Sequence, residues 1–227
     1  MSKRRYYRHL IGIAMILVLA LLVDVSGLDL WLAKQFYHWQ GDQWALRYGF
    51  ITETVLHKGV RKTLVLLTLL LLLIAIASHW LRRIKHLQRW FWYLLACFVT
   101  TPLLVAIAKK FTHMDCPWDV AVLGGKYPYL HLLQAHPGSW PYGHCFPAAH
   151  ASGGYALMAL FFFCHANCPR WRIPALLLAF SIGVISGFTQ QLRGAHFLSH
   201  DLWTIAIAWL VSVTYLLLLF PEKSVTA

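Results

Sequence analysis

The sequence predicts an all-α protein that crosses a membrane six times, and three observations support that prediction. The 227 residues are 59% hydrophobic and 12% charged, whereas soluble domains average about half apolar and about a quarter charged. A soluble fold of this length could not bury so much apolar surface, and disorder requires low hydrophobicity. Apolar runs of about 20 residues, the length of a membrane-spanning helix, recur along the chain. Basic residues gather between these runs, as on the cytoplasmic side of membrane proteins.

The apolar runs place six spans. They cover about residues 10–28, 63–81, 90–108, 147–165, 173–189 and 202–220. The first follows several basic residues, but its apolar core is longer than the roughly 7–15 residues of a signal peptide and no small-residue cleavage site follows, so we expect a span. The fourth is weakened at its start by Gly153 and Gly154. Since no repeat or linker divides the chain, we expect one domain, residues 1–227.

The distribution of charge predicts the orientation. The net charge of +12 could indicate nucleic acid, an anionic membrane or an anionic substrate. With the N-terminus in the cytoplasm, however, the short cytoplasmic segments hold eleven of the twenty basic residues and only one acid, Glu222, which satisfies the positive-inside rule. Those basic residues are Lys3, Arg4, Arg5, Arg8, Arg82, Arg83, Lys85, Arg89, Arg170, Arg172 and Lys223. Most of the charge is therefore a topology signal, and no nucleic-acid partner is expected.

Two long segments lie on the outer side in this topology. Residues 29–62 are rich in aromatic residues and predict short helices lying in the membrane interface, whereas residues 109–149 predict an irregular loop. Cys116 and Cys145 both fall in that loop. An oxidising outer compartment such as a periplasm would allow a disulfide between them, and two free thiols are the alternative.

Polar and ionisable residues gather in three segments on the outer side, where their cost near the membrane calls for a functional hypothesis. The segments leave the third span, enter the fourth, and join the fifth to the sixth. Converging there, they would form a pocket containing Lys109, Lys110, His113, His150, Arg193, His196, His200 and Asp201. Fixed cations beside several imidazoles suit a phosphate whose chemistry needs proton transfer, because the cations bind oxygens and imidazoles act as nucleophile or acid.

The three segments resemble the signature of the type 2 phosphatidic acid phosphatase superfamily. Its pattern is K-x6-R-P, then P-S-G-H, then S-R-x5-H-x3-D. Here Lys109 precedes Cys116-Pro117 by the required spacing, residues 147–150 read P-A-A-H, and residues 189–196 end in His196. The resemblance covers the third to sixth spans. It implies a phosphatase with His196 as nucleophile, His150 as general acid and Lys109 as phosphate ligand, without cofactor or metal.

The sequence also departs from that pattern. Cys116 replaces an Arg, Gln190 replaces another, and His200 stands where an orienting Asp is expected. Ala148 and Ala149 replace the Ser and Gly that help to cradle phosphate, so backbone N–H groups would have to serve. Arg193 shares a helical face with Gln190 and is expected to bind the phosphate instead. Either Asp201 or His200 would orient His196, and we slightly favour Asp201 because a carboxylate suits that role.

Several alternatives remain open from the sequence. His196 and His200, four residues apart, could be zinc ligands, and other histidines could bind haem. Lys110 could contact phosphate or lipid headgroups. The expected activity is metal-independent hydrolysis of a lipid phosphate or diphosphate at the periplasmic face of a bacterial inner membrane, with both termini cytoplasmic. The rivals are a lipid-to-lipid phosphotransferase of the same fold and a non-catalytic anion-binding membrane protein or transporter.

Overall fold

The computed structural model describes residues 3–135, 137–139, 141 and 143–221. Eight α-helices are formed in this part of the chain: α1 (Lys3–Val25), α2 (Leu28–Trp39), α3 (Val60–Ala77), α4 (Gln88–Thr112), α5 (Ala149–Ala156), α6 (Leu160–Asn167), α7 (Arg172–Leu192) and α8 (Leu198–Leu219). Short helical turns connect them: η1 (Ala45–Tyr48), η2 (Phe50–Gly59), η3 (Lys85–Leu87), η4 (Pro117–Asp119), η5 (Ala121–Leu123), η6 (Leu157–Ala159) and η7 (Pro169–Trp171). The all-α prediction is confirmed. Glu222 and Lys223 lie outside the described residues.

Five helical stretches of the described residues are long and apolar enough to cross a membrane. They are Tyr6–Val25, Phe50–Ala77, Lys85–Asp119, Pro169–Leu192 and Leu198–Leu219. The fourth predicted span does not meet this criterion, because α5 and α6 are each eight residues long and a 3-10 turn, η6, separates them. The second span starts at Phe50 rather than at residue 63, because the π-helix η2 runs directly into α3.

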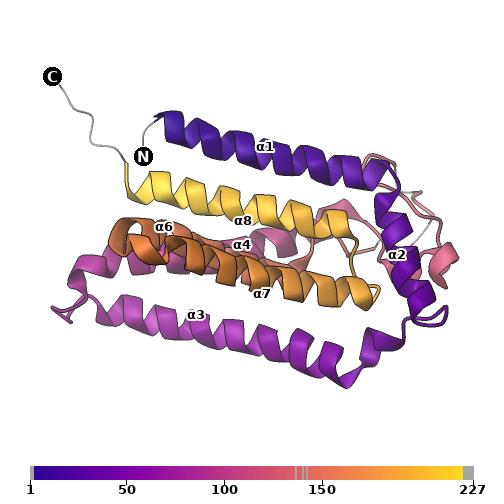
Figure 1. Ribbon diagram of the computed structural model, residues 1–227, viewed down its shortest axis with the longest axis horizontal. Helices are drawn as coiled ribbons and strands as arrows, with labels where there is room; N and C mark the ends of the chain where they lie inside the picture. Colours follow the sequence, from indigo (N-terminus) through magenta and orange to yellow (C-terminus); the bar gives the residue numbers. More distant parts are fainter. Residues whose placement is uncertain (1–2, 136, 140, 142, 222–227) are drawn as a thin grey trace.

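The long helices run roughly antiparallel along one axis (Figure 1). α1 lies beside α8 on one side of the bundle, and α3 forms the opposite edge. The start of α1 and the end of α8 lie at one end. At the other end α2 crosses the bundle, together with the loops between α4 and α5. All three polar segments therefore reach the end that α2 covers.

The outward faces of the helices are apolar, as expected for surfaces that face lipid. On α3 the exposed side chains include Val65, Leu66, Leu69, Leu70 and Leu73. A soluble protein would not expose so continuous an apolar surface. The core lies between α4, α6 and α8, where Tyr93 and Phe162 are buried, and between α5, α7 and α8.

Helix α2 and its C-cap residue Gln40 fix the end of the bundle that α2 covers through hydrogen bonds. Asp29 Oδ1 on α2 accepts a bond of 3.0 Å from the backbone N–H of Ser199, in the first turn of α8. Gln40 Nε2 donates to the carbonyl of Leu192, at the end of α7, at 2.9 Å. These bonds satisfy backbone groups that helix ends leave free, and they hold the corner between α7 and α8.

The loop before α5 is tied back to the end of α4. Cys116 and Cys145 form a disulfide with their Cα atoms 5.2 Å apart. The Cys145 N–H donates to the Met114 carbonyl at 3.0 Å, and Thr112 Oγ1 donates to the Phe146 carbonyl at 2.6 Å. These contacts fix the chain that enters α5.

Glycines allow α5 to approach α7 closely. A Cβ atom on Gly154 would lie 2.6 Å from the backbone nitrogen of Gly183 on α7. The pair Gly153-Gly154, which weakened the predicted fourth span, is thus needed for helix packing, as small residues often are between membrane helices.

We predict that Gly154→Ala lowers the thermal stability of the protein in detergent. The new methyl group must push α5 from α7, and overpacking of this kind costs roughly 1–3 kcal/mol. Gly12→Ala on α1 is the matched control, since a Cβ there meets nothing within 4 Å. Equal melting temperatures for the two variants would contradict the packing argument.

Candidate active site

The ends of four elements bring the predicted site residues together. Lys109 lies in the last turn of α4, His150 in the first turn of α5, His196 in the corner between α7 and α8, and His200 in the first turn of α8. Lys109 interacts electrostatically with His150, His196 and His200. One cation and three imidazoles from distant segments thus share one site.

His196 and His200 lie against each other in the interior. Their side chains are almost completely buried, at 4% and 1% exposure, and their Nδ1 atoms are 3.5 Å apart. The backbone carbonyl of Cys145 bonds to both rings. Burial lowers the pKa of His196 well below its usual 6.5, and Lys109 lowers it further. His196 is therefore neutral at pH 7, as a nucleophilic imidazole must be.

Asp201 contacts a different neighbour from the one that we favoured. Its Oδ2 accepts a hydrogen bond of 2.6 Å from Gln191 Nε2 on α7, and its carboxylate packs against the Cα of Gly187. Successive residues of a helix project about 100° apart. Because α8 begins at Leu198, His200 faces His196 while Asp201 faces α7.

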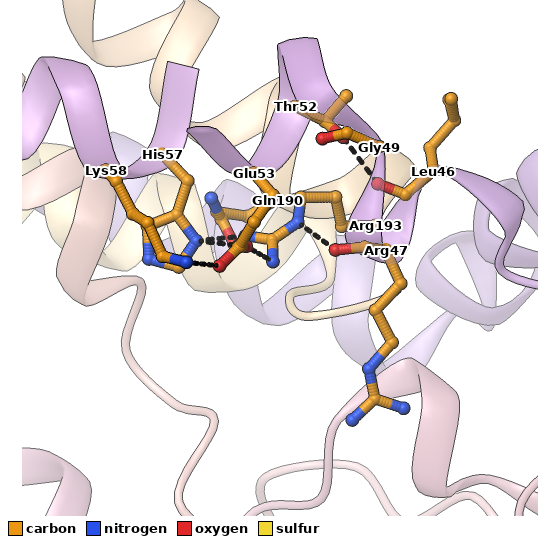
Figure 2. Close-up of polar contacts among 9 residues, drawn as sticks. All are labelled: Leu46, Arg47, Gly49, Thr52, Glu53, His57, Lys58, Gln190 and Arg193. Carbon is orange, nitrogen blue, oxygen red and sulfur yellow. Dashed lines mark hydrogen bonds and ion pairs between the residues drawn. The ribbon is translucent and has the colours of Figure 1, made fainter. Parts of the chain in front are cut away.

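Arg193 is held by the protein itself (Figure 2). Nε donates to the carbonyl of Arg47 at 2.9 Å, Nη1 donates to Gln190 Oε1 at 3.0 Å and to His57 Nδ1, and Nη2 pairs with Glu53 Oε2. Four of the five guanidinium N–H groups therefore have protein partners, and 6% of the side chain is exposed. A bound phosphate would have to share Arg193 with Glu53.

His57 and Glu53 belong to the site and were missed from the sequence. The ring of His57 packs edge to face on the ring of His150, with centroids 3.8 Å apart. Glu53 Oε2 lies 3.3 Å from His57 Nδ1, and Glu53 Oε1 pairs with Lys58 at 2.8 Å. The available signal was the spacing Glu53-x3-His57-x3-Arg61, which places three ionisable residues beside the start of an apolar span.

The remaining predicted residues have separate positions. The N–H of Ala148 donates to Thr204 Oγ1 at 3.0 Å, so it is engaged within the protein. Ala149 begins α5 and lines a cavity between α3, α4, α5 and α7, whereas Lys110 is exposed. His113 lines a second, smaller cavity of about 140 Å³ that contains none of the other predicted residues.

A cavity of about 530 Å³ lies between α3, α4, α5 and α7. Its polar end holds His57, Arg61, His150 and Gln190. Most of its walls are apolar, and several wall residues are also exposed on the outside of α3 and α4: Val65, Leu67, Leu69 and Val99. The cavity thus opens sideways from the bundle. His196 does not line it and lies buried near its polar end, beside Lys109 and His150.

Metal ligands require a cluster of suitable side chains. Among the residues that the structure describes, no group of three or more His, Cys, Asp or Glu side chains is arranged to hold a metal ion.

Comparisons with known proteins agree with the fold. The model of the PAP2 superfamily matches residues 90–223. A solved structure, described as the first transmembrane PAP2 type phosphatidylglycerolphosphate phosphatase from Bacillus subtilis, is similar with a TM-score of 0.57 and 15% identity. The similarity covers 92% of this chain and 93% of that one. A search of curated protein sequences finds no match.

We predict that Arg193→Met destabilises the protein by about 2 kcal/mol or more, because it removes hydrogen bonds to a charged group and leaves Glu53 poorly paired. Lys58→Met is the matched control. It removes an ion pair to the same carboxylate, but Lys58 is 60% exposed, and an exposed pair contributes at most about 1 kcal/mol. The free energy of unfolding in detergent measures the stability of both variants. If Lys58→Met destabilises the protein as much as Arg193→Met, the structural role given to Arg193 is contradicted.

Proposed function

The chain belongs to the PAP2 superfamily and has its transmembrane phosphatase fold, and from that premise we propose that it removes phosphate from a lipid phosphate or diphosphate. The reaction would take place at the periplasmic face of a bacterial inner membrane. Candidate substrates are phosphatidate, phosphatidylglycerophosphate, undecaprenyl diphosphate and lipid A phosphates. The similar solved structure from Bacillus subtilis is described as a phosphatidylglycerolphosphate phosphatase, which makes that lipid the first to test.

The cavity, with one polar end and apolar walls, is the observation that supports a lipid as the substrate. Its polar end holds the imidazoles of His57 and His150, and its apolar walls reach the lipid-facing sides of α3 and α4. A phosphorylated headgroup suits the polar end, and an acyl or prenyl chain suits the walls. A water-soluble phosphate ester would gain nothing from those walls, because it has no apolar surface to bury.

The proposed mechanism uses two histidines. Nδ1 of His196 faces His200, which leaves Nε2 to attack phosphorus. The phosphorus–oxygen bond to the lipid breaks as His150 gives a proton to the leaving oxygen. Water then attacks the phosphohistidine while His150 takes the proton of that water, and phosphate leaves. The positive charge of Lys109 stabilises the transferring phosphoryl group.

The neighbours of His196 support its role as the nucleophile. His200 and the carbonyl of Cys145 both contact its ring and limit its rotation. A fixed tautomer and orientation is what a third group supplies to a catalytic imidazole. His200 and Cys145 thus fit the orienting role that the sequence assigned with some preference to Asp201.

We predict that purified protein releases phosphate from phosphatidylglycerophosphate in detergent with a chelator present, and that His196→Ala lowers the rate by at least 1,000-fold, on the order of the loss when a covalent nucleophile is removed. A radiolabelled substrate phosphate should label the wild type and not His196→Ala. His38→Ala, on the exposed side of α2, is the control. Label that passes to a second lipid rather than to free phosphate would favour the phosphotransferase, and no turnover across the lipid panel would refute catalysis.

We also predict the position of the acid limb of kcat/KM. Activity is lost as the pH falls through the pKa of His196, because protonation removes the attacking lone pair. The pKa of His196 is lowered, so this loss should occur below pH 6.5. Ionisation of the substrate phosphate could also produce an acid limb, and the variant His200→Gln distinguishes the two causes. His200 contributes to lowering the pKa of His196, so a limb that belongs to His196 should move upward in this variant. A wild-type limb at or above 6.5 would contradict the assignment.

A further inference from the structure

The segment before α3 inserts ionisable side chains into the site from outside the family-matched region. Residues 50–59 form the π-helix η2, whereas the match covers residues 90–223. Glu53 and His57 lie four residues apart on it, each with 19% of its side chain exposed. π-helical turns are uncommon and are frequent at functional sites. The segment is therefore a place to look for a role that the family pattern does not contain.

The contacts of His57 fix which of its nitrogens carries a proton. Arg193 Nη1 bonds to His57 Nδ1, and a guanidinium can only donate. A neutral His57 must therefore accept at Nδ1 and carry its proton on Nε2. If His57 is protonated instead, Nδ1–H can turn toward Glu53 Oε2, 3.3 Å away, and Nε2 still carries a proton. In both states Nε2–H is a donor.

His57 belongs to the polar end of the cavity. It lines the cavity together with His150 and Arg61, and Arg193 occupies Nδ1 rather than Nε2. The packing of His57 on His150, with centroids 3.8 Å apart, brings the ring that carries this donor beside the imidazole that would protonate the leaving oxygen.

Several neighbouring groups do not supply a donor at this position. Ala148 and Ala149 have no polar side chain, the N–H of Ala148 is engaged by Thr204, and Arg193 is engaged by Glu53 and Gln190. His57 is held rigidly by the same Arg193 and Glu53 contacts, so its donor is preorganised. Such a donor stabilises the charge that develops on a transferring phosphoryl group.

We propose that His57 is a substrate-binding residue of this site, which donates a hydrogen bond from Nε2 to an oxygen of the lipid phosphate held beside His150. The assignment rests on the proposed phosphatase function. Arg193 and Glu53 then act as positioning residues, because they hold the ring of His57, and it is His57 that donates to the phosphate.

Two amide substitutions separate the nitrogens of His57. His57→Asn keeps an oxygen near the position of Nδ1, which can accept from Arg193, but it has no donor at the position of Nε2. His57→Gln places an amide N–H near Nε2 and loses the acceptor for Arg193. We expect His57→Asn to lose about 100-fold in kcat/KM for phosphatidylglycerophosphate, as when one transition-state donor is removed, and His57→Gln to stay within about tenfold of the wild type.

His38→Asn is the matched control, because His38 also contacts a carboxylate four residues away, that of Asp42, but is 60% exposed. Its kcat/KM should equal that of the wild type. If His57→Asn is at least as active as His57→Gln, the proposal is overturned and His57 serves only to anchor Arg193. This holds even when both variants lose activity, since the donor alone should restore activity in His57→Gln.

Binding of inorganic phosphate distinguishes this proposal from the phosphatase function. Phosphate should raise the melting temperature of the wild type and of His57→Gln, and should raise that of His57→Asn by less than half as much. This pattern in a protein that releases no phosphate from lipids would refute the proposed function but support the role of His57. A wild type that turns over lipid phosphate while both variants bind phosphate equally would refute the role of His57 alone.

Discussion

The pairing of the buried Arg193 guanidinium with Glu53 is the interaction on which the site depends. It joins the π-helix before α3 to the corner between α7 and α8, two segments that are 140 residues apart. A buried guanidinium is costly unless its donors are satisfied, so the partners of Arg193 must all be in place together. Satisfying them brings His57 against His150 and sets one wall of the cavity. The stability of the α2-covered end of the bundle and the geometry of the candidate site therefore have a common origin.

The rest of the site is organised around groups that cannot be left unpaired near a membrane. Asp29 on α2 accepts from the start of α8, and the carbonyl of Cys145 contacts His196 and His200. Asp29 is buried, and burial raises its pKa to about 6. Helix α2 thus supports the candidate site by placing the start of α8, although it contributes none of the motif residues.

The sequence predicted the all-α membrane fold because long apolar runs report directly on helices that contact lipid. It also predicted which three segments meet, since motif spacing and span count put them on one side. It did not predict that His200, rather than Asp201, faces His196, because that depends on α8 starting at Leu198. His57 and Glu53 were missed because they lie within residues 29–62, whose aromatic-rich composition predicted helices in the membrane interface. Only the tertiary contact with Arg193 gives them a place in the site.

The sideways opening of the cavity between α3 and α4 has a consequence for how such a protein would meet its substrate. Molecules that enter from within the bilayer arrive by diffusion in two dimensions, so the encounter rate follows their surface density and not their bulk concentration. Adding inert lipid or detergent would then slow the reaction by dilution within the surface even at constant molarity. Saturation would have to be expressed as the mole fraction of substrate in the membrane, and crowding of the leaflet would act as a control on turnover.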